Sequence, residues 1–255
     1  MTSQAPIGLL TGKVVLLIGA SAGIGADAAR VFAEEGASVM LAARSAEPLA
    51  ALAATLQEAG HDVAWVAGDV SRAADAARFV DATLERWGRL DGAFNNAALT
   101  QGGRLDEVTE EDFDRIFSVN VKGVWLALRE EIRGMAAAGG SIVNASSIGG
   151  VRGSSGLGAY QATKHAVIGL TRTAAHDNGP RGIRVNAIAP GPIETPMLEA
   201  TRRAIPGGVE ARIAATPLRK AGTTAEVAQT VAWLLSDRSS HISGVVLPVD
   251  GGFSA

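Results

Sequence analysis

Short apolar segments alternate along this chain with longer stretches that carry apolar residues at helical spacing. The apolar segments span residues 14–18, 37–43, 63–67, 90–94, 141–145, 183–189 and 245–249. Most are rich in Val and Ile, and several are apolar throughout, which is typical of parallel strands covered on both faces. Helices are expected between them, at about 23–36, 46–59, 72–87, 111–137, 158–178 and 224–236. This alternation predicts a doubly wound α/β fold with about seven parallel strands, right-handed crossovers and helices on both faces.

The organisation of the sequence indicates a single domain over residues 1–255, because no linker, internal repeat or low-complexity tract divides it. The 72–87 helix is expected to follow an N-cap at Ser71 and to end at Gly88. Residues 190–223 break the alternation with clustered prolines and two short helical pieces. A long irregular segment after a late strand is often a lid over a ligand site, and a surface insertion without a function is the alternative.

Composition excludes several classes of protein. Hydrophobic residues make up 47% of the chain and charged residues 19%, and the net charge is −3, so no basic face is expected for nucleic acid or an anionic membrane. The absence of cysteine excludes disulfides and thiolate metal sites. The start lacks a signal-peptide pattern, and no run approaches the ~20 apolar residues of a membrane span. A cytoplasmic protein is therefore expected. No metal site is expected, because the histidines are scattered: His61, His165, His176 and His241.

A glycine-rich turn directly follows the first apolar segment. It reads Gly19-Ala-Ser21-Ala-Gly23-Ile24-Gly25, and a helical pattern begins within it. Glycines allow a tight turn and a close approach of the backbone, and a helix N-terminus presents free N–H groups to phosphate. The spacing differs from the familiar G-x-G-x-x-G. Its position at the first strand-to-helix turn nevertheless predicts a site for the pyrophosphate of a dinucleotide.

The end of the second apolar segment bears on which dinucleotide is bound. Folds that prefer NAD usually place a carboxylate there, about 20 residues after the glycines, to pair with the ribose 2′-hydroxyl. This chain has Ala43 and Arg44 instead. A guanidinium suits a 2′-phosphate, so NADP(H) is favoured and NAD(H) stays open. The alternative is that Arg44 only ends a strand in solvent.

Tyr160 and Lys164 are spaced i, i+4 at the start of a predicted helix, so their side chains share one face. A nearby ammonium, helped by an oxidised nicotinamide, would lower the phenol pKa from its ordinary value of about 10 and bring proton transfer toward neutral pH. Ser147 lies at the end of the fifth apolar segment, where parallel sheets bind ligands, and could donate to a substrate oxygen. On chemistry alone, Ser146 is an equally good candidate.

Taken together, these features resemble the short-chain dehydrogenase/reductase family over nearly the whole chain. The matching pieces are Gly19–Gly25, Asp69-Val70, Asn95-Asn96-Ala97-Ala98, Asn120, Ser147, Tyr160, Lys164, Pro190-Gly191 and Thr195. The resemblance implies a single Rossmann domain and an NAD(P)-dependent oxidoreductase that moves hydride between a nicotinamide and a carbonyl or secondary alcohol carbon.

The resemblance also implies a role for each matching residue. Tyr160 would be the general acid/base, Ser147 would orient the substrate oxygen, and the motif register selects Ser147 over Ser146. Lys164 would bind the nicotinamide ribose and lower the pKa of Tyr160, and Asn120 would hold a water that extends the proton relay. The expected cofactor contacts are Gly19, Ser21, Gly23, Ile24, Gly25, Arg44, Asp69, Val70, Asn95, Tyr160, Lys164, Pro190, Gly191, Ile193 and Thr195. Asp69 would contact the adenine, and Asn95 would support the loop on the cofactor side.

The chain departs from the family pattern at two positions. Ile18 replaces the usual Thr before the first glycine, so a hydroxyl that helps tie the turn is missing, and Ala98 replaces a glycine in the Asn-Asn-Ala-Gly segment. His176 and Asn178 are also unusual and are expected at a helix end, without a catalytic role.

Two rival functions remain beside an oxidoreductase. An epimerase or dehydratase of the extended relatives generally carries a larger C-terminal substrate domain, which this chain lacks room for after Pro190. A non-catalytic dinucleotide-binding sensor usually loses Ser, Tyr or Lys of the site, and all three are present here.

The resemblance suggests a homotetramer, with the 111–137 and 158–178 helices packed across subunits. Val121, Val124, Leu126 and Leu128 fit that interface and fit burial within one chain equally well. Substrate identity and direction stay open among 3-oxoacyl thioesters, simple alcohols, steroids and sugars, although NADPH use favours reduction. The lid residues make a largely apolar pocket plausible. The apolar ones are Met197, Leu198, Ile205, Ile213 and Leu218, and Glu194, Arg202, Arg203 and Arg212 are interspersed among them.

Overall fold

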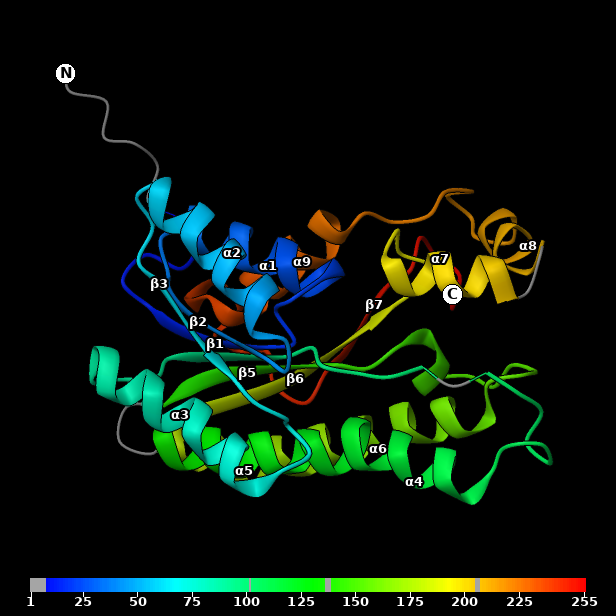
Figure 1. Cartoon of the computed structure of the whole chain (residues 1–255), viewed down its shortest axis with the longest axis horizontal. Coiled ribbons are helices and arrows are strands. Elements are labelled where there is room, and N and C mark those ends of the chain that lie inside the picture. Colours follow the sequence, from blue (N-terminus) through cyan, green and yellow to red (C-terminus); the bar gives the residue numbers. More distant parts are fainter. Residues whose placement is uncertain (1–7, 101, 136–138, 205–206) are drawn as a thin grey trace.

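The computed structural model describes residues 8–100, 102–135, 139–204 and 207–255, and its centre is one seven-stranded parallel sheet (Figure 1). The strands are β1 (Val14–Ile18), β2 (Ser38–Ala43), β3 (Val63–Ala67), β4 (Gly92–Asn95), β5 (Gly140–Ala145), β6 (Ile183–Pro190) and β7 (Val246–Val249). Their order across the sheet is β3-β2-β1-β4-β5-β6-β7. The predicted doubly wound parallel sheet is confirmed.

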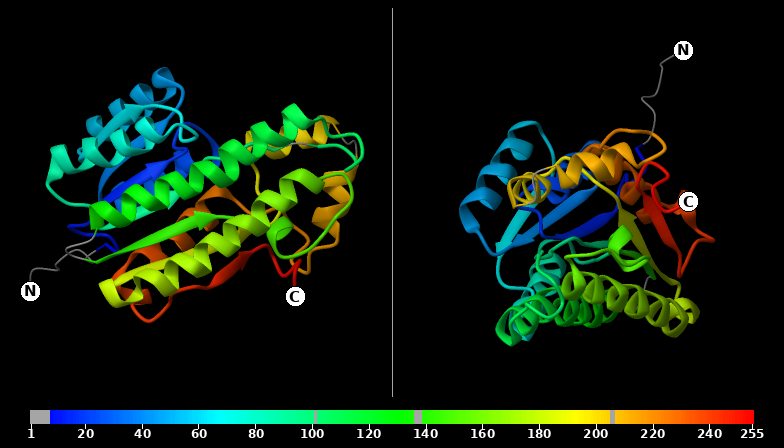
Figure 2. Two further views of the ribbon diagram at one scale, coloured as in Figure 1. Left: turned by 90° about the horizontal axis from the view of Figure 1, so that it is seen from below. Right: turned by 90° about the vertical axis from the view of Figure 1, so that its right-hand side faces the viewer.

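Helices cover both faces of this sheet. One face carries α1 (Gly23–Glu34), α2 (Ala46–Glu58) and α9 (Thr224–Leu235), and the other carries α3 (Ala73–Trp87), α5 (Gly123–Met135) and α6 (Gly158–Asn178). The end-on view in Figure 2 shows the sheet between these two layers. Short 3₁₀ turns occur at η2 (Ile148–Gly150), η3 (Gly179–Arg181) and η4 (Asp237–Ser239).

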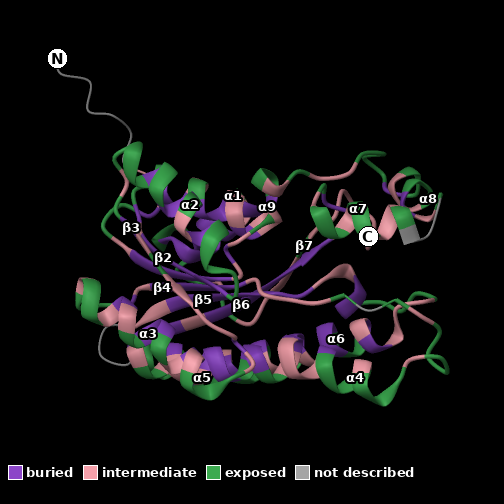
Figure 3. Cartoon of the chain, viewed as in Figure 1, coloured by how far each residue is buried: buried purple, intermediate pink, exposed green. Residues whose placement is uncertain are grey.

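Side-chain alternation along the strands divides the core into two layers. In β1, Val15 and Leu17 pack with α1, α2 and α9, while Leu16 and Ile18 pack with α3 and α5 on the opposite face. All five residues of β1 are buried, which explains why this strand is apolar throughout rather than alternating (Figure 3).

Two details of the sequence prediction are wrong. The stretch expected as one helix over 111–137 is α4 (Glu110–Phe117), a π-helical turn η1 (Ser118–Lys122) and α5, and residues 136 and 137 lie outside the described residues. Ser71 is not the N-cap of α3. Its backbone N–H and hydroxyl both donate to Asp69, and Arg72 takes the cap position with an extended backbone. The predicted end at Gly88 is confirmed, because its left-handed φ of 72° closes the helix.

The strand order reverses direction between β1 and β4, and in such sheets ligands bind outside the carboxyl ends of the strands at this point. The irregular segment after β6 holds α7 (Pro196–Ala204) and α8 (Gly208–Ala214), which stand beyond the end of β6 in Figure 1. Residues 205 and 206 of this segment lie outside the described residues. Within the described chain, no helix is long and apolar enough to cross a membrane.

Candidate active site

Two adjoining cavities lie at the carboxyl ends of the strands. The first, of about 300 Å³, is bounded by the glycine-rich turn, the end of β2 and the loop after β4. The second, of about 260 Å³, is bounded by the segments after β5 and β6 and by the start of α6. Both are lined by Ile24, Asn96, Ala98, Thr195 and Met197. A ligand that reaches from the glycine turn to Tyr160 therefore passes through a continuous cleft.

The glycine turn is shaped for close backbone packing and for an anion. A Cβ at Gly25 would stand 2.0 Å from the carbonyl oxygen of Gly19, and one at Gly19 would stand 2.5 Å from the amide nitrogen of Ala97. Helix α1 starts here with no side-chain cap and no acidic residue in its first turn. Its first N–H groups are left for a ligand, so these residues fit the pyrophosphate of a dinucleotide.

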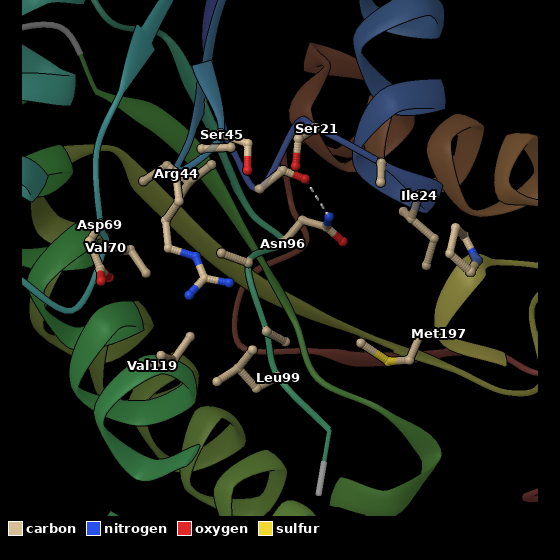
Figure 4. Close-up of a pocket in the computed structure, with 18 of the residues that line it drawn as sticks. Ser21, Ile24, Arg44, Ser45, Asp69, Val70, Asn96, Leu99, Val119 and Met197 are labelled. Carbon is tan, nitrogen blue, oxygen red and sulfur yellow. Dashed lines mark hydrogen bonds between the residues drawn. The ribbon is translucent and has the colours of Figure 1, made fainter. Parts of the chain in front are cut away.

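Asn96 ties this turn to the loop after β4. Its side-chain amide donates to the carbonyl oxygen of Gly19 at 3.0 Å (Figure 4), and its backbone N–H donates to Ile18 at 2.9 Å. The sequence analysis gave the supporting role to Asn95. Asn95 is 3% exposed and points instead beneath the sheet, where it donates to Glu131 and Asn144, both at 3.0 Å. Consecutive residues at a strand end face opposite ways, so it is Asn96 that contacts the glycine turn here.

Arg44 and Asp69 form the wall of the first cavity farthest from Tyr160. Figure 4 shows the Arg44 side chain extending into the cavity, with Asp69, Val70 and Ser45 around it. Burial favours the protonated carboxyl of Asp69. Hydrogen bonds from Ser71 and the positive charges of Arg44 and Arg72 outweigh that effect and hold the pKa of Asp69 below its ordinary value. Among the described residues lining this cavity, Asp69 is the sole carboxylate, and it follows β3 rather than the end of β2.

Ser147 and Tyr160 both line the second cavity, and the Ser147 side chain interacts with the Tyr160 phenol in the direction that lowers its pKa. Ser147 follows β5 and its Oγ accepts the Gly149 N–H at 3.1 Å, which fixes the hydroxyl at the end of the sheet. Ser146 is buried, and its hydroxyl donates to the Lys164 carbonyl oxygen at 2.9 Å. The structure therefore separates two serines that were equivalent on chemistry, and places Ser147 beside Tyr160.

Lys164 lies one helical turn beyond Tyr160 on α6 and is 3% exposed. Its Nζ donates to the Ala145 carbonyl oxygen at 2.8 Å and stands 5.7 Å from the centre of the Tyr160 ring. Burial lowers the pKa of Lys164 to about 8. Burial also raises the pKa of Tyr160, despite the opposing hydrogen bond with Ser147. Burial is thus the larger of the two effects on the Tyr160 phenol, and the lowering of its pKa by Lys164 together with an oxidised nicotinamide stays a prediction.

Asn120 sits in the π-helical turn η1 and is completely buried. Its side-chain amide donates to the Leu99 carbonyl oxygen at 2.9 Å and to the Thr163 hydroxyl at 3.0 Å, and its Oδ1 accepts the Leu99 N–H at 2.8 Å. Both amide hydrogens are used, so this side chain links the loop after β4 to α6. The predicted role of Asn120 in holding a water of the proton relay stays a prediction.

Most residues expected at the site line one of the two cavities. They are Gly19, Ser21, Gly23, Ile24, Arg44, Asp69, Val70, Ser147, Tyr160, Lys164, Pro190, Gly191, Ile193 and Thr195. Gly25, Asn95 and Asn120 do not line either cavity and act at most through neighbours. His176 and Asn178 lie in the last turn of α6, away from both cavities, as expected.

The second cavity also has walls that the sequence analysis did not place there. Arg152 and Phe253 line it, although they stand about a hundred residues apart in the chain. The lid residues Met197, Leu198 and Arg212 line it as well, while Leu218 is 64% exposed and lies outside it. No local pattern marks Arg152 or Phe253, because only the folded chain brings them together. No group of three His, Cys, Asp or Glu residues in the described part of the chain is arranged to hold a metal ion.

Comparisons with known proteins agree with this geometry. Residues 19–254 match a family model described as enoyl-(acyl carrier protein) reductase. The chain is 44% identical to the A-factor type γ-butyrolactone 1′-reductase (1S-forming) of Streptomyces virginiae, over 97% of both chains. It is 39% identical to a 2,5-dichloro-2,5-cyclohexadiene-1,4-diol dehydrogenase of Sphingobium indicum, over 96% of this chain and 98% of that one.

The solved structure of a levodione reductase superposes with a TM-score of 0.91 at 40% identity, covering 96% of this chain and 98% of that chain. A levodione reductase of Leifsonia aquatica is 39% identical over 99% of this chain and 98% of its own length. The family model and the relatives span nearly the whole chain, and the fold is shared with a solved relative. This protein therefore belongs to the short-chain dehydrogenase/reductase family of NAD(P)-dependent oxidoreductases.

Proposed function

We propose that this enzyme is an NADPH-dependent carbonyl reductase in which Tyr160 is the general acid. The observation that carries the proposal is that Tyr160 and Ser147 line one cavity, which adjoins the glycine turn, and that their hydroxyls interact there. The two hydroxyls can bind one carbonyl oxygen together. When bound, the reduced nicotinamide supplies the hydride. The N-terminus of α1 would hold its pyrophosphate, and the Pro190–Thr195 segment would border its nicotinamide end.

The protonation state of Tyr160 supports the direction of reduction. Because burial raises the pKa of Tyr160, the phenol stays protonated at neutral pH and has a proton to donate to the forming alkoxide. Ser147 would hold the carbonyl oxygen in place. Lys164 stands beside the Tyr160 ring and would resupply the proton, and Asn120 would hold the next water of the relay.

The test of this assignment is Tyr160→Phe, which removes the hydroxyl and keeps the ring. We expect kcat/KM for ketone reduction with NADPH to fall by about 10²- to 10⁴-fold, the usual contribution of general acid catalysis. The dissociation constant for NADPH, measured by fluorescence, should stay within about twofold, since binding energy comes mainly from the first cavity. Equal turnover by the variant would exclude Tyr160 as the acid. If neither protein turns over a wide panel of ketones and alcohols while both bind NADPH, the non-catalytic sensor is the better assignment.

Arg44 supports a preference for NADP(H). Its side chain extends into the first cavity, and no carboxylate stands at the end of β2, where NAD-preferring folds usually have one. A guanidinium bonded to a 2′-phosphate is a charge-assisted contact, so Arg44→Ala should weaken NADPH binding by about 10- to 100-fold and leave NADH binding unchanged. Arg72→Ala is the matched control, because Arg72 is near Asp69 but does not line the cavity. Tighter binding of NADH than NADPH by the wild type would overturn this assignment.

A further inference from the structure

The second cavity carries an uneven distribution of charge. Arg152, Lys164 and Arg212 line it, and among the described residues of its wall no Asp or Glu is present. The chain as a whole has a net charge of −3. Positive groups concentrated in a cleft with low-dielectric walls raise the local concentration of anions. Lys164 has a role in the proposed proton relay, whereas the guanidinium groups of Arg152 and Arg212 have none in the proposed reaction.

Arg212 is directed into this cavity by the geometry of α8. It is partly buried, and it makes no hydrogen bond or ion pair within the described part of the chain. Glu210, two residues earlier, lies on another side of the helix, because successive residues turn by about 100°. Its carboxylate accepts the Arg202 Nε at 3.0 Å. Helix α8 thus presents its acid to α7 and its Arg212 guanidinium to the cavity.

The lid leaves no carboxylate to neutralise Arg212. Its acidic residues are Glu194, Glu199 and Glu210, and all three bind the single side chain of Arg202. Arg202 bonds both oxygens of Glu194 at 2.8 Å and so is fully committed within this cluster. A cation that lines a ligand cavity and has no partner in the described chain is available to an anionic ligand.

Arg152 is fixed at another part of the same wall. Its guanidinium carbon lies 4.9 Å above the centre of the Phe253 ring, and its Nη1 donates to the Phe253 carbonyl oxygen at 3.0 Å. Arg152 is exposed, and this contact positions its guanidinium plane while its other N–H groups have no partner in the described chain. A guanidinium held in this way favours planar recognition of a carboxylate.

We infer that the natural substrate of the Tyr160 site is an oxo acid, a carbonyl compound whose carboxylate is bound by Arg212, with Arg152 as the second cation of the pocket. The inference rests on the proposed function for the reacting end. There the carbonyl carbon gains hydride from the reduced cofactor, the carbonyl oxygen gains the Tyr160 proton, and a hydroxy acid leaves. At the other end, Arg212 selects the carboxylate and is a specificity-determining residue rather than a catalytic one.

The experiment compares oxo acids with their isosteric primary amides. The panel is 4-oxopentanoate, 5-oxohexanoate and 7-oxooctanoate, each beside its amide, reduced with NADPH by wild type and Arg212→Gln. One charge-assisted hydrogen bond corresponds to about 10- to 100-fold in kcat/KM, so the wild type should prefer at least one acid by that factor. Arg212→Gln should abolish the preference by lowering kcat/KM for the acid, with less than about twofold change for the amide.

Arg203→Gln is the matched control. Arg203 lies on the same lid but is exposed and does not line the cavity, so its loss removes equal charge without removing a contact to a ligand in the cavity. It should keep the preference for the acid. Equal or better reduction of the amides by the wild type, or an equal loss for acid and amide in Arg212→Gln, would overturn the inference.

A binding measurement separates this inference from the proposed function. Calorimetry of the same acids and amides with wild type and Arg212→Gln, each saturated with NADP⁺, reports carboxylate recognition without turnover. If no compound of the panel is reduced but the acid binds about tenfold tighter than the amide and Arg212→Gln removes that difference, the reductase assignment fails and the carboxylate site stands. If binding shows no such difference, the carboxylate site is excluded whatever the turnover.

Discussion

Glu131 is a buried acid that the proposed reaction does not use. It lies on α5 with no exposed surface, and its Oε2 accepts the Asn95 amide at 3.0 Å. Burial raises the pKa of Glu131 to about 8, so the side chain is protonated at neutral pH. Glu131 Oε1 and Asn95 Oδ1 are both buried without a partner in the described chain. A proton on Oε1 supplies the donor that this pair lacks, and Asn95 links it onward to Asn144 on β5.

This raised pKa predicts how stability changes with pH. The unfolded carboxyl titrates near pH 4.5 and the folded one near pH 8, so the folded protein binds the extra proton between these values. The contribution is therefore fully present below pH 4.5 and is lost as pH rises to 8. Glu131→Gln keeps a neutral amide at this position at every pH, so its stability does not depend on this proton. The difference in free energy of unfolding between the variant and the wild type should therefore shift in favour of the variant by on the order of 2–4 kcal/mol from pH 5 to pH 8.

Urea unfolding of both proteins at pH 5 and pH 8 measures this difference. Glu130→Gln is the control, because ion pairs with Arg129 and Arg133 keep the pKa of Glu130 below its ordinary value despite its burial. Its carboxylate is ionised throughout this range, so the control should differ from wild type by the same amount at both pH values. If the difference in free energy of unfolding between Glu131→Gln and wild type is the same at pH 5 and pH 8, Glu131 is not protonated in the folded protein.

Among the elements, α7 and α8 are held to each other by one arginine. Arg202 on α7 bonds Glu210 on α8, Glu194 before α7 and Glu199 within it. These contacts cross from one lid helix to the other and to the end of β6, and they lie on the outside of the second cavity. We propose that residues 190–223 act as the substrate lid and that this cluster keeps it in place over Tyr160.

Breaking the cluster should affect the lid more than the fold. Arg202→Gln is expected to raise KM for the carbonyl substrate about 3- to 10-fold, because the pocket then forms in a smaller fraction of molecules. The midpoint of thermal unfolding should stay within about 2 °C, since exposed ion pairs contribute little to global stability. Steady-state kinetics and thermal scans measure both. Lys220→Gln, which breaks the pair with Glu226 away from the cavity, should leave KM unchanged, and an equal change in both variants would exclude a lid-specific role.

At the scale of the whole molecule, the chain leaves apolar surface on the layer formed by α4 and α5. Val124, Leu126 and Leu128, cited from the sequence as interface residues, are buried within the chain. Trp125 and Phe113 are 46% and 40% exposed on that layer. Large exposed aromatics in a soluble-type composition often mark an interaction surface. These two residues, rather than the three buried ones, support the proposed homotetramer.

Light scattering after size-exclusion chromatography tests the assembly. We expect a mass of four times the 26.0 kDa chain at micromolar concentration. Trp125→Glu should lower that mass, because a carboxylate in an apolar interface is costly, and should leave the circular dichroism spectrum of the fold intact. Trp65→Glu is the control, since Trp65 is similarly exposed, at 41%, on the edge strand β3. A monomer in the wild type would exclude the tetramer.

Local sequence patterns are enough to predict the fold and the kind of chemistry. A strand buried on both faces requires a continuous apolar segment, so β1 can be predicted from its own residues. A turn that closely approaches another backbone segment requires glycine, so the Gly19–Gly25 turn can be predicted in the same way. The same holds for Tyr160 and Lys164, which one helical turn places on one side of α6. Such features depend on neighbours within a few residues and are visible without any coordinates.

Other features depend on how the chain packs. They include which of two adjacent serines or asparagines reaches the site, and which residues surround the substrate. Ser147 faces Tyr160 while Ser146 faces the Lys164 backbone, and Asn96 rather than Asn95 holds the glycine turn. The pKa of Tyr160 follows from burial, which no residue spacing reports. Arg152 meets Phe253, and Arg212 stays free of the lid's acids, through contacts between distant segments. Side-chain direction, desolvation and long-range pairing are properties of the packed chain, so the sequence pattern could not supply them.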